Sequence, residues 1–272
     1  MSRGNSDNNA SRIPRRSPCR KRNYLENWGG TPLLARWTTD FDCGYENGWW
    51  YIVKDSPFDP SSLKAKRRYE ITKGTRYFDV KRIRPEAYAE ELYSVQVAAF
   101  SGYPTKSRPH VEHDAFVKSV SNWGAAIIYG AFFRESGELA GYAMLHQISD
   151  RWMEFNVLKT VPAFEKYAVN AAIVSAILAA FESYLASGGI ICDGSRSINH
   201  ETHFQDYLEK YFGFRKAYCK LHIAYHPKIK WVIRAIYPFR LLLQKLDGIG
   251  FIHQINAVLK MEEITRSCKC PI

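Results

Sequence analysis

The chain has 272 residues, of which 46% are hydrophobic and 14% aromatic, and this is enough apolar material for one large domain or two small ones. A net charge of +11 favours an anionic partner, such as nucleic acid, a phosphorylated cofactor or an anionic membrane face, although an ordinary basic surface gives the same charge. No apolar run reaches the roughly 18–20 residues of a membrane span, and no apolar segment follows the basic N-terminus as in a signal peptide.

The cysteines indicate a reducing compartment. The six cysteines show no paired CxxC spacing, and Cys192 and Cys219 lie inside apolar segments. We therefore expect reduced cysteines and a cytoplasmic location.

The first quarter of the chain is predicted to precede the main domain. Residues 1–22 are polar and basic, so we expect a disordered tail, with an arm that contacts nucleic acid or membrane as the alternative. Residues 23–75 are predicted to form an N-terminal extension. In it, residues 49–53 have the aromatic and β-branched content of a strand, and Asp59-Pro60 begins a basic helix that closes at Gly74.

The middle of the chain predicts helices followed by a meander. Residues 78–83 form a strand, and helices are expected from Pro85 through Phe100 and over 110–120. His110 and His113 suggest a metal site, but no third ligand stands at a supporting spacing, so we predict no metal. The remaining predicted strands, which form an antiparallel meander, are 124–133, 139–148 and 152–160.

The segment from 152 to 214 is the centre of the predicted fold. Val161-Pro162 ends the strand 152–160, and residues 168–185 are apolar almost all round, which predicts a buried helix. Residues 190–193 form a short buried strand, and an amphipathic helix covers 200–211. A strand, a crossover helix and a second strand are expected to place the two strands in parallel. The helix N-terminus then faces the carboxyl end of the first strand, where free N–H groups can hold phosphate.

The C-terminal part differs in character. Residues 214–225 are predicted to form one long strand or a bent pair. Residues 227–264 mix large apolar residues with Lys and Arg, Pro238 divides two helical pieces, and 251–261 is a further short helix. One interpretation is that these helices pack back on the domain. The other is an interfacial segment, 228–260, that lies on an anionic membrane, at its inner face.

This order of elements resembles the GNAT acyltransferase fold. Val161-Pro162 before the central helix and the closing 212–215, Phe-Gly-Phe-Arg, carry the resemblance. The basic helix that ends in Lys73-Gly74, Asp193-Gly194 and the motif 211–214 are similar to the Fem-type branch of GNAT-like proteins. The resemblance implies an α/β (α+β) fold with a mixed central sheet, an antiparallel meander followed by a parallel strand pair, and helices on both faces. The implied domain is 76–226, with a helical extension at 227–272.

The resemblance also implies an activity and a donor. We expect an acyltransferase, acting by direct attack, that moves an acyl group from acyl-CoA, with acetyl-CoA as the first candidate, to an amine or hydroxyl. The acceptor would be a small molecule or a lipid-linked cell-envelope precursor in a bacterial cell. The alternatives are an aminoacyl-tRNA-dependent Fem-type transferase and a non-catalytic binding module of the same fold. The family's Gln/Arg-x-x-Gly-x-Gly/Ala loop aligns with 165–170, where both glycines are missing.

The resemblance places the candidate site residues around the two central strands. Glu154 and Asp193 are candidate bases, and Tyr207 and Tyr211 are candidate acids for the leaving thiolate. Asp193 has the alternative role of bracing its loop, and tyrosines at helical spacing are often core residues. The predicted donor-binding residues, with a backbone oxyanion donor near 156–158, are Asn156, Val157, Leu158, Lys166, Tyr167, Ala168, Asn170 and Asn199.

Overall fold

The computed structural model describes residues 33–103, 108–198 and 203–267, and these form two compact units. The larger unit is 40–219. The smaller unit joins the described residues up to Thr39 with those from Lys220 onward. The predicted tail 1–22 and the C-terminal Cys268 and Cys270 lie outside the described residues.

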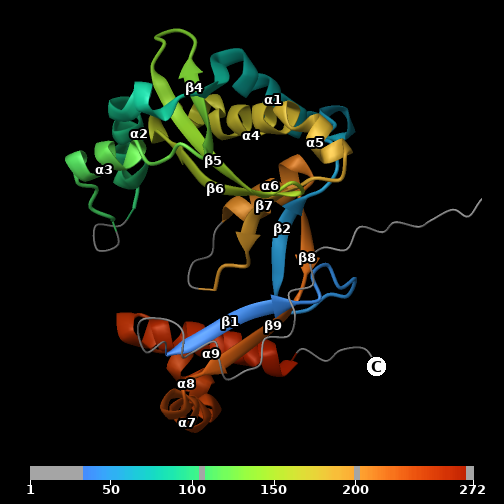
Figure 1. The fold of residues 1–272 in the computed structure, drawn as a ribbon, viewed down its shortest axis with the longest axis vertical. Coiled ribbons are helices and arrows are strands. Elements are labelled where there is room, and N and C mark those ends of the chain that lie inside the picture. The colour runs from blue at the N-terminus through green and yellow to red at the C-terminus, as the bar shows by residue number, and fades with distance from the viewer. Residues whose placement is uncertain (1–32, 104–107, 199–202, 268–272) are drawn as a thin grey trace, which may run out of the picture. The chain divides into compact units, whose positions relative to one another are not determined.

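A seven-stranded mixed sheet runs through the larger unit, in the order β3-β4-β5-β6-β7-β2-β8 (Figure 1). The three meander strands β4, β5 and β6 pair antiparallel, and β6 pairs in parallel with β7, as the sequence predicts. The predicted fold class is therefore confirmed. The strands are β2 (Trp50–Lys54), β3 (Phe78–Ile83), β4 (Ala126–Phe133), β5 (Leu139–Ser149), β6 (Trp152–Thr160), β7 (Ile190–Ser195) and β8 (Arg215–Tyr218).

Helices cover both faces of this sheet (Figure 1). One face packs on α1 (Ala65–Tyr77), α4 (Val169–Ala180) and α6 (His203–Phe212) in a core that includes Ile71, Ile173 and Phe212. The other face packs on α2 (Ala89–Ser101) and α3 (His113–Val120) around Leu92 and Val120. The short helices of this unit are η1 (Pro60–Ser62), η2 (Pro85–Tyr88), η4 (Pro162–Tyr167) and α5 (Glu182–Ala186).

The helix α4 is buried on nearly every side, as its apolar sequence predicts. Ile173, Val174 and Ile177 are buried, and the hydroxyl of Ser175 donates to the carbonyl of Ala171 at 2.7 Å, which satisfies the polar group inside the core. The predicted single helix over 168–185 is divided at Phe181, whose backbone leaves the helical region. The apolar pattern continues through this break, so it gives no sign of it.

The strand β2 lies inside the main sheet, between β7 and β8, and pairs antiparallel with both. The sequence predicts these residues in an N-terminal extension. Ile52 and Val53 are buried, with Ile52 in the core that holds α4. Their β-branched side chains fit a strand that is covered on both faces.

Gly74 permits a close approach between α1 and α4. The helix α1 continues through Gly74 to Tyr77, beyond its predicted end. A Cβ at position 74 would stand 2.7 Å from the carbonyl oxygen of Ala168 and 2.8 Å from the amide nitrogen of Ala172. These are backbone atoms, so they have little freedom to move aside.

The substitution Gly74→Ala is expected to destabilise the protein by about 1–2 kcal/mol. Alanine favours a helix interior by about 1 kcal/mol over glycine, but a methyl group forced against two backbone atoms costs about 2–3 kcal/mol, the upper end of the range for overpacking. The free energy of unfolding from urea denaturation measures the difference. Thr75→Ala, at the exposed neighbouring position of α1, is the matched control and is expected to change stability little. A Gly74→Ala protein as stable as this control would contradict the close-approach interpretation.

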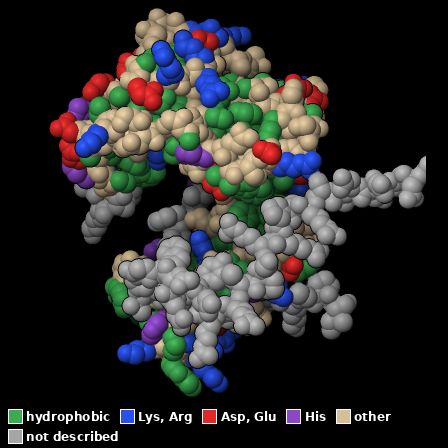
Figure 2. Space-filling view, viewed as in Figure 1, with side chains coloured by type: hydrophobic (Ala, Val, Ile, Leu, Met, Phe, Trp, Pro, Cys, Tyr) green, Lys and Arg blue, Asp and Glu red, His purple; other side chains and the backbone are tan. Residues whose placement is uncertain are grey.

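The smaller unit is a two-stranded sheet with a helical layer. β1 (Leu34–Thr39) pairs antiparallel with β9 (Lys220–Tyr225), and α9 (Gly250–Ser267) packs against β9. Of the two alternatives predicted for 214–225, one long strand or a bent pair, the second is present as β8 and β9, which belong to different sheets. Figure 2 shows hydrophobic side chains beside Lys and Arg over the helices of this unit. Its other helices are α7 (Pro227–Ile236), η5 (Tyr237–Phe239) and α8 (Arg240–Gln244).

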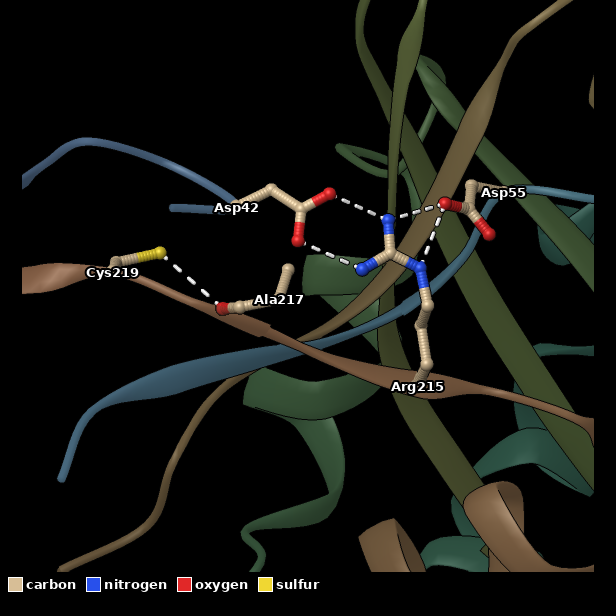
Figure 3. A network of polar contacts seen from close by, with 5 residues as sticks. All are labelled: Asp42, Asp55, Arg215, Ala217 and Cys219. Carbon is tan, nitrogen blue, oxygen red and sulfur yellow. Dashed lines mark hydrogen bonds and ion pairs between the residues drawn. The ribbon is translucent and has the colours of Figure 1, made fainter. Parts of the chain in front are cut away.

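The closing Phe-Gly-Phe-Arg motif ends in a structural ion pair. Arg215 donates to both carboxylate oxygens of Asp42, at 2.8 and 2.7 Å, and its Nε donates to Asp55 at 2.9 Å (Figure 3). The hydrogen bond from Arg215 holds the pKa of Asp42 below its ordinary value. This bidentate contact ties β8 to the segments on either side of β2.

Candidate active site

A cavity opens where the two parallel strands separate. β6 and β7 pair only from Trp152 to Glu154, opposite Ile190 to Cys192, and diverge after that point. The cavity there has a volume of about 570 Å³. It is lined by residues from α2 and the segment after it, from β6, η4, the start of α4, β7 and α6: Ala99, Gly102, Tyr103, Phe155, Asn156, Leu158, Lys159, Thr160, Pro162, Glu165, Asn170, Asp193 and Phe204.

A β-bulge in β6 shapes one side of this cavity. Leu145 of β5 pairs with Phe155, and Met144 pairs with Val157, so Asn156 is an extra residue without a partner in this ladder. The side chains of Phe155 and Val157, which are two residues apart, then pack into cores on opposite faces of the sheet. The regular alternation that would put Glu154, Asn156 and Leu158 on one face is therefore broken at the bulge.

The side chain of Asn156 is held on both sides. The ring Nδ1 of His146 donates to Asn156 Oδ1 at 2.8 Å, with the tautomer assigned from this bond, and Asn156 Nδ2 donates to Glu154 Oε2 at 3.4 Å. Glu154 thus lies beside the site and contacts the cavity through Asn156.

Asp193 lines the cavity, and its pKa is far above the ordinary value of an aspartate. It lies at the end of β7, where Tyr51 pairs with Ser195 and Val53 with Cys192, so that β7 also contains an extra residue. Gly194, with φ of +96°, provides the bend. Burial raises the pKa of Asp193 to about 7, against a smaller lowering by its hydrogen bond with Gln205. A carboxyl group with this pKa can accept a proton near neutral pH.

The turn between β6 and α4 keeps a glycine-like backbone without a glycine. Ala168 has φ of 62°, in the left-handed region, and its N–H donates to the carbonyl of Glu165 at 2.9 Å. This conformation costs an alanine about 1–2 kcal/mol, so the surrounding packing holds it. α4 begins directly afterwards, and Asn170 in its first turn accepts from Thr160 Oγ1 at 3.3 Å inside the cavity.

Lys159 supplies a positive charge to the cavity. Its ammonium lies 4.5 Å from the ring centre of Phe100 and 6.0 Å from that of Tyr103. Burial lowers the pKa of Lys159. No described carboxylate forms an ion pair with it, although Glu165 also lines the cavity. A half-buried ammonium beside two aromatic rings is suited to an anionic ligand.

No family model matches the chain, and a search of curated proteins also gives no match. Solved structures do resemble it. L-PGS from Bacillus licheniformis is 12% identical with a TM-score of 0.48, over 87% of this chain and 69% of that protein. FemX is 9% identical with a TM-score of 0.43, over 62% and 59%. A GCN5-related N-acetyltransferase-like protein from Streptococcus suis is 12% identical with a TM-score of 0.37, over 71% and 63%.

The fold is GNAT-like. An antiparallel meander followed by a parallel strand pair is the arrangement that the resemblance implies, and it is present in this sheet. Because the TM-scores of these structures are below 0.5, the fold is argued from this sheet and the site from its own residues.

The GNAT-like sheet brings only some of the predicted residues to the cavity. Asp193, Asn156, Leu158 and Asn170 line it. Asn199 lies outside the described residues. The predicted residues that do not line it are Glu154, Val157, Lys166, Tyr167, Ala168, Tyr207 and Tyr211.

The two candidate acids and the predicted phosphate-binding lysine lie outside the cavity lining and contact aromatic side chains. Tyr207 packs between Phe204 and Phe212, and burial raises its pKa. Tyr211 lies against Tyr207 and beneath the guanidinium of Arg67. Lys166 is exposed and lies 4.9 Å from the ring centre of Tyr167. The roles assigned to them stay predictions, and Lys159, which the sequence did not single out, is the lysine at the cavity.

Within the described residues, no group of three or more His, Cys, Asp or Glu side chains is placed to hold a metal ion. His113 instead bonds two carboxylates, Glu90 and Asp114, each at 2.8 Å. The Glu90 hydrogen bond, followed by that of Asp114, raises the pKa of His113 to about 8.

The raised pKa of His113 is expected to depend on its hydrogen bonds with Glu90 and Asp114. Because its pKa in the folded state is raised, its contribution to stability is full below about pH 6.5 and is lost as the pH rises through 8. NMR titration of the ring protons should give a pKa near 8, and Glu90→Gln should lower it. A value that does not change in Glu90→Gln would show that the contact is not formed in solution.

Proposed function

We propose that the chain is an acyltransferase that moves an acyl group from a thioester donor, acyl-CoA, to an amine or hydroxyl by direct attack. The acceptor is proposed to be a small molecule or a lipid-linked precursor. The observation that carries the proposal is Asp193, with a pKa of about 7, in the cavity between the separated strands β6 and β7.

Asp193 would act as the base of the reaction. The acceptor amine attacks the thioester carbonyl carbon, and Asp193 takes the proton that the nitrogen loses as the new bond forms. The oxyanion collapses, the carbon–sulfur bond breaks, and the thiolate leaves with the electron pair. A thiol has a pKa of about 8.5, so the thiolate is a good leaving group and takes its proton from Asp193 or water.

The bulge in β6 supports stabilisation of the oxyanion. An extra residue in a strand leaves backbone groups outside the regular ladder, and the residues around Asn156 lie at the cavity. An N–H group at this position could donate to the oxygen as its negative charge develops. The hydrogen bonds of the Asn156 side chain with His146 and Glu154 would keep this backbone in one conformation.

Lys159 and the start of α4 support the donor's phosphates. The free N–H groups of a first helical turn and a nearby ammonium both favour an anion. The left-handed turn at Ala168 directs the chain into α4 although no glycine is present. The negative charge of Glu165 in the same cavity opposes anion binding, so the proposed phosphate site depends on Lys159.

The test compares two lysines. Thermal stability is measured with and without acetyl-CoA and longer acyl-CoAs, because a ligand at about 100 times its dissociation constant stabilises a fold by roughly 2.7 kcal/mol. Lys159→Met is expected to weaken binding roughly 10- to 100-fold, by removing a charge-assisted contact. Lys166→Met, outside the cavity, is the matched control and should bind as the unmodified protein does. The absence of any shift with acyl-CoA would overturn the donor assignment.

The basic helix α1 favours a second candidate, an aminoacyl-tRNA donor. Residues 64–76 contain six Lys or Arg and a single Glu. Such a helix is suited to phosphate backbones, and its binding would weaken with salt. A tRNA titration at two salt concentrations, repeated with Lys64→Glu and Lys66→Glu, distinguishes the donors. Salt-sensitive tRNA binding without an acyl-CoA shift would select this candidate.

A further inference from the structure

The helices of the smaller unit have an apolar outer surface. Within the described residues, fourteen large apolar side chains are exposed, and eight of them fall between residues 231 and 251. Trp231 is 70% exposed and Phe251 73%. We call this set the helical patch; its other members are Val232, Phe239, Leu241, Leu242, Leu246 and Ile249.

These apolar side chains are exposed although the smaller unit has a hydrophobic core. The unit has a separate buried side: Ile233 of α7 is buried, as are Leu259, Met261 and Ile264 of α9. The helix α9 packs this side against β9, where Tyr225 donates to Glu262 at 2.9 Å. The side chains of the helical patch therefore lie outside this buried side, and exposed apolar groups of this kind mark interaction sites.

The charge of the same segment is strongly positive. Residues 227–251 contain five Lys or Arg and a single acid, Asp247. Asp247 is engaged by Asn256 at 2.6 Å and His253 at 2.8 Å. In the described part of the chain, Lys228, Lys230 and Lys245 have no carboxylate partner.

We propose that the helical patch binds the surface of an anionic phospholipid bilayer. Exposed Trp, Phe and Leu side chains would enter the boundary between headgroups and acyl chains, while the lysines contact the phosphates. A second copy of the chain fits less well, because two-fold pairing would place the same lysines opposite one another. None of the helices in the described part of the chain combines the length and apolar character that a bilayer crossing requires, so the proposed contact is peripheral.

The test is flotation of the full chain with vesicles of phosphatidylcholine alone and of phosphatidylcholine with phosphatidylglycerol. Binding is expected only to the second type and should fall with salt. Trp231→Ala with Phe251→Ala should reduce the partition coefficient at least tenfold. Lys228→Gln with Lys230→Gln should reduce it roughly 25-fold, because each basic residue at such a surface contributes about fivefold.

Two controls keep the test specific. Tyr69→Ala, at an exposed aromatic residue of α1, and Lys64→Gln with Lys66→Gln should leave vesicle binding unchanged. Because all these side chains are exposed, melting temperatures should not move. No binding to the anionic vesicles, equal loss in the α1 variants, or a dimer by light scattering that Trp231→Ala dissolves would each overturn the proposal. This inference is independent of the proposed acyl transfer, which is measured without vesicles.

Discussion

Replacing Asp193 with asparagine is expected to lower kcat by about 10²–10⁴-fold, the usual contribution of a general base. The change is nearly isosteric, and the asparagine oxygen can still accept from Gln205. Donor affinity, which the proposal assigns to Lys159 and the start of α4, should change little. The measurement is the rate of thiol release with an acyl-CoA and an amine acceptor, at several pH values.

The pH profile distinguishes a base from a structural residue. Burial raises the pKa of Asp193 to about 7, so the rate of the unmodified protein should rise through pH 7, where it is half-maximal, and then level off. The residual rate of Asp193→Asn should not show this rise with pH. Turnover of the asparagine variant with the same pH dependence as the unmodified protein would show that another group takes the proton.

The same substitution should stabilise the fold. In the unfolded chain an aspartate has a pKa near 3.9, so the folded state binds more protons between about pH 4 and 7, and stability is lost as the pH rises through this range. Asparagine carries no charge to bury. Asp193→Asn is therefore expected to be more stable at pH 8, by up to about 4 kcal/mol, while catalysing less. Glu154→Gln, outside the cavity lining, is the comparison and should show no gain in stability.

Truncation of Phe212 to alanine is expected to lower the free energy of unfolding by about 3–5 kcal/mol. Phe212 is 0% exposed, and its ring centre lies 5.4 Å from that of Phe58 and 5.5 Å from that of Tyr207. The loss is a large fraction of the roughly 5–15 kcal/mol that holds a domain folded. Urea denaturation followed by circular dichroism measures the change.

The control for this substitution is an aromatic residue of the same unit. Tyr69 is 63% exposed, so Tyr69→Ala should alter stability by no more than about 0.5 kcal/mol. A similar small effect in Phe212→Ala would mean that the Phe-Gly-Phe turn is not packed as the structure has it.

The strand–helix–strand unit could be predicted because its signals are local. Pro162 ends a strand, an apolar run of helical length follows, and a short apolar segment then repeats the strand pattern. Their parallel pairing follows from the crossover connection, and Asp193 was placed at the cavity by its position at the end of the second strand.

The parts that could not be predicted depend on backbone geometry and distant contacts. A bulge at Asn156 leaves no trace in an alternating sequence, and because it shifts the register, Lys159 was not singled out. The absence of glycine at 168 suggested a lost turn, yet tertiary packing holds Ala168 in the left-handed region. The position of β2 inside the sheet is a pairing over a long sequence separation, which local patterns do not encode.

The placement of β2 has a consequence for how the chain assembles. β2 emerges from the ribosome early, whereas its two neighbours, β7 and β8, are synthesised much later. Closing such a long loop is slow, so the meander is expected to form first and β7 to remain an open edge until β2 inserts. A chain in which β2 cannot pair should accordingly self-associate through β7. The residues that precede the meander would thus act as an internal protection against aggregation.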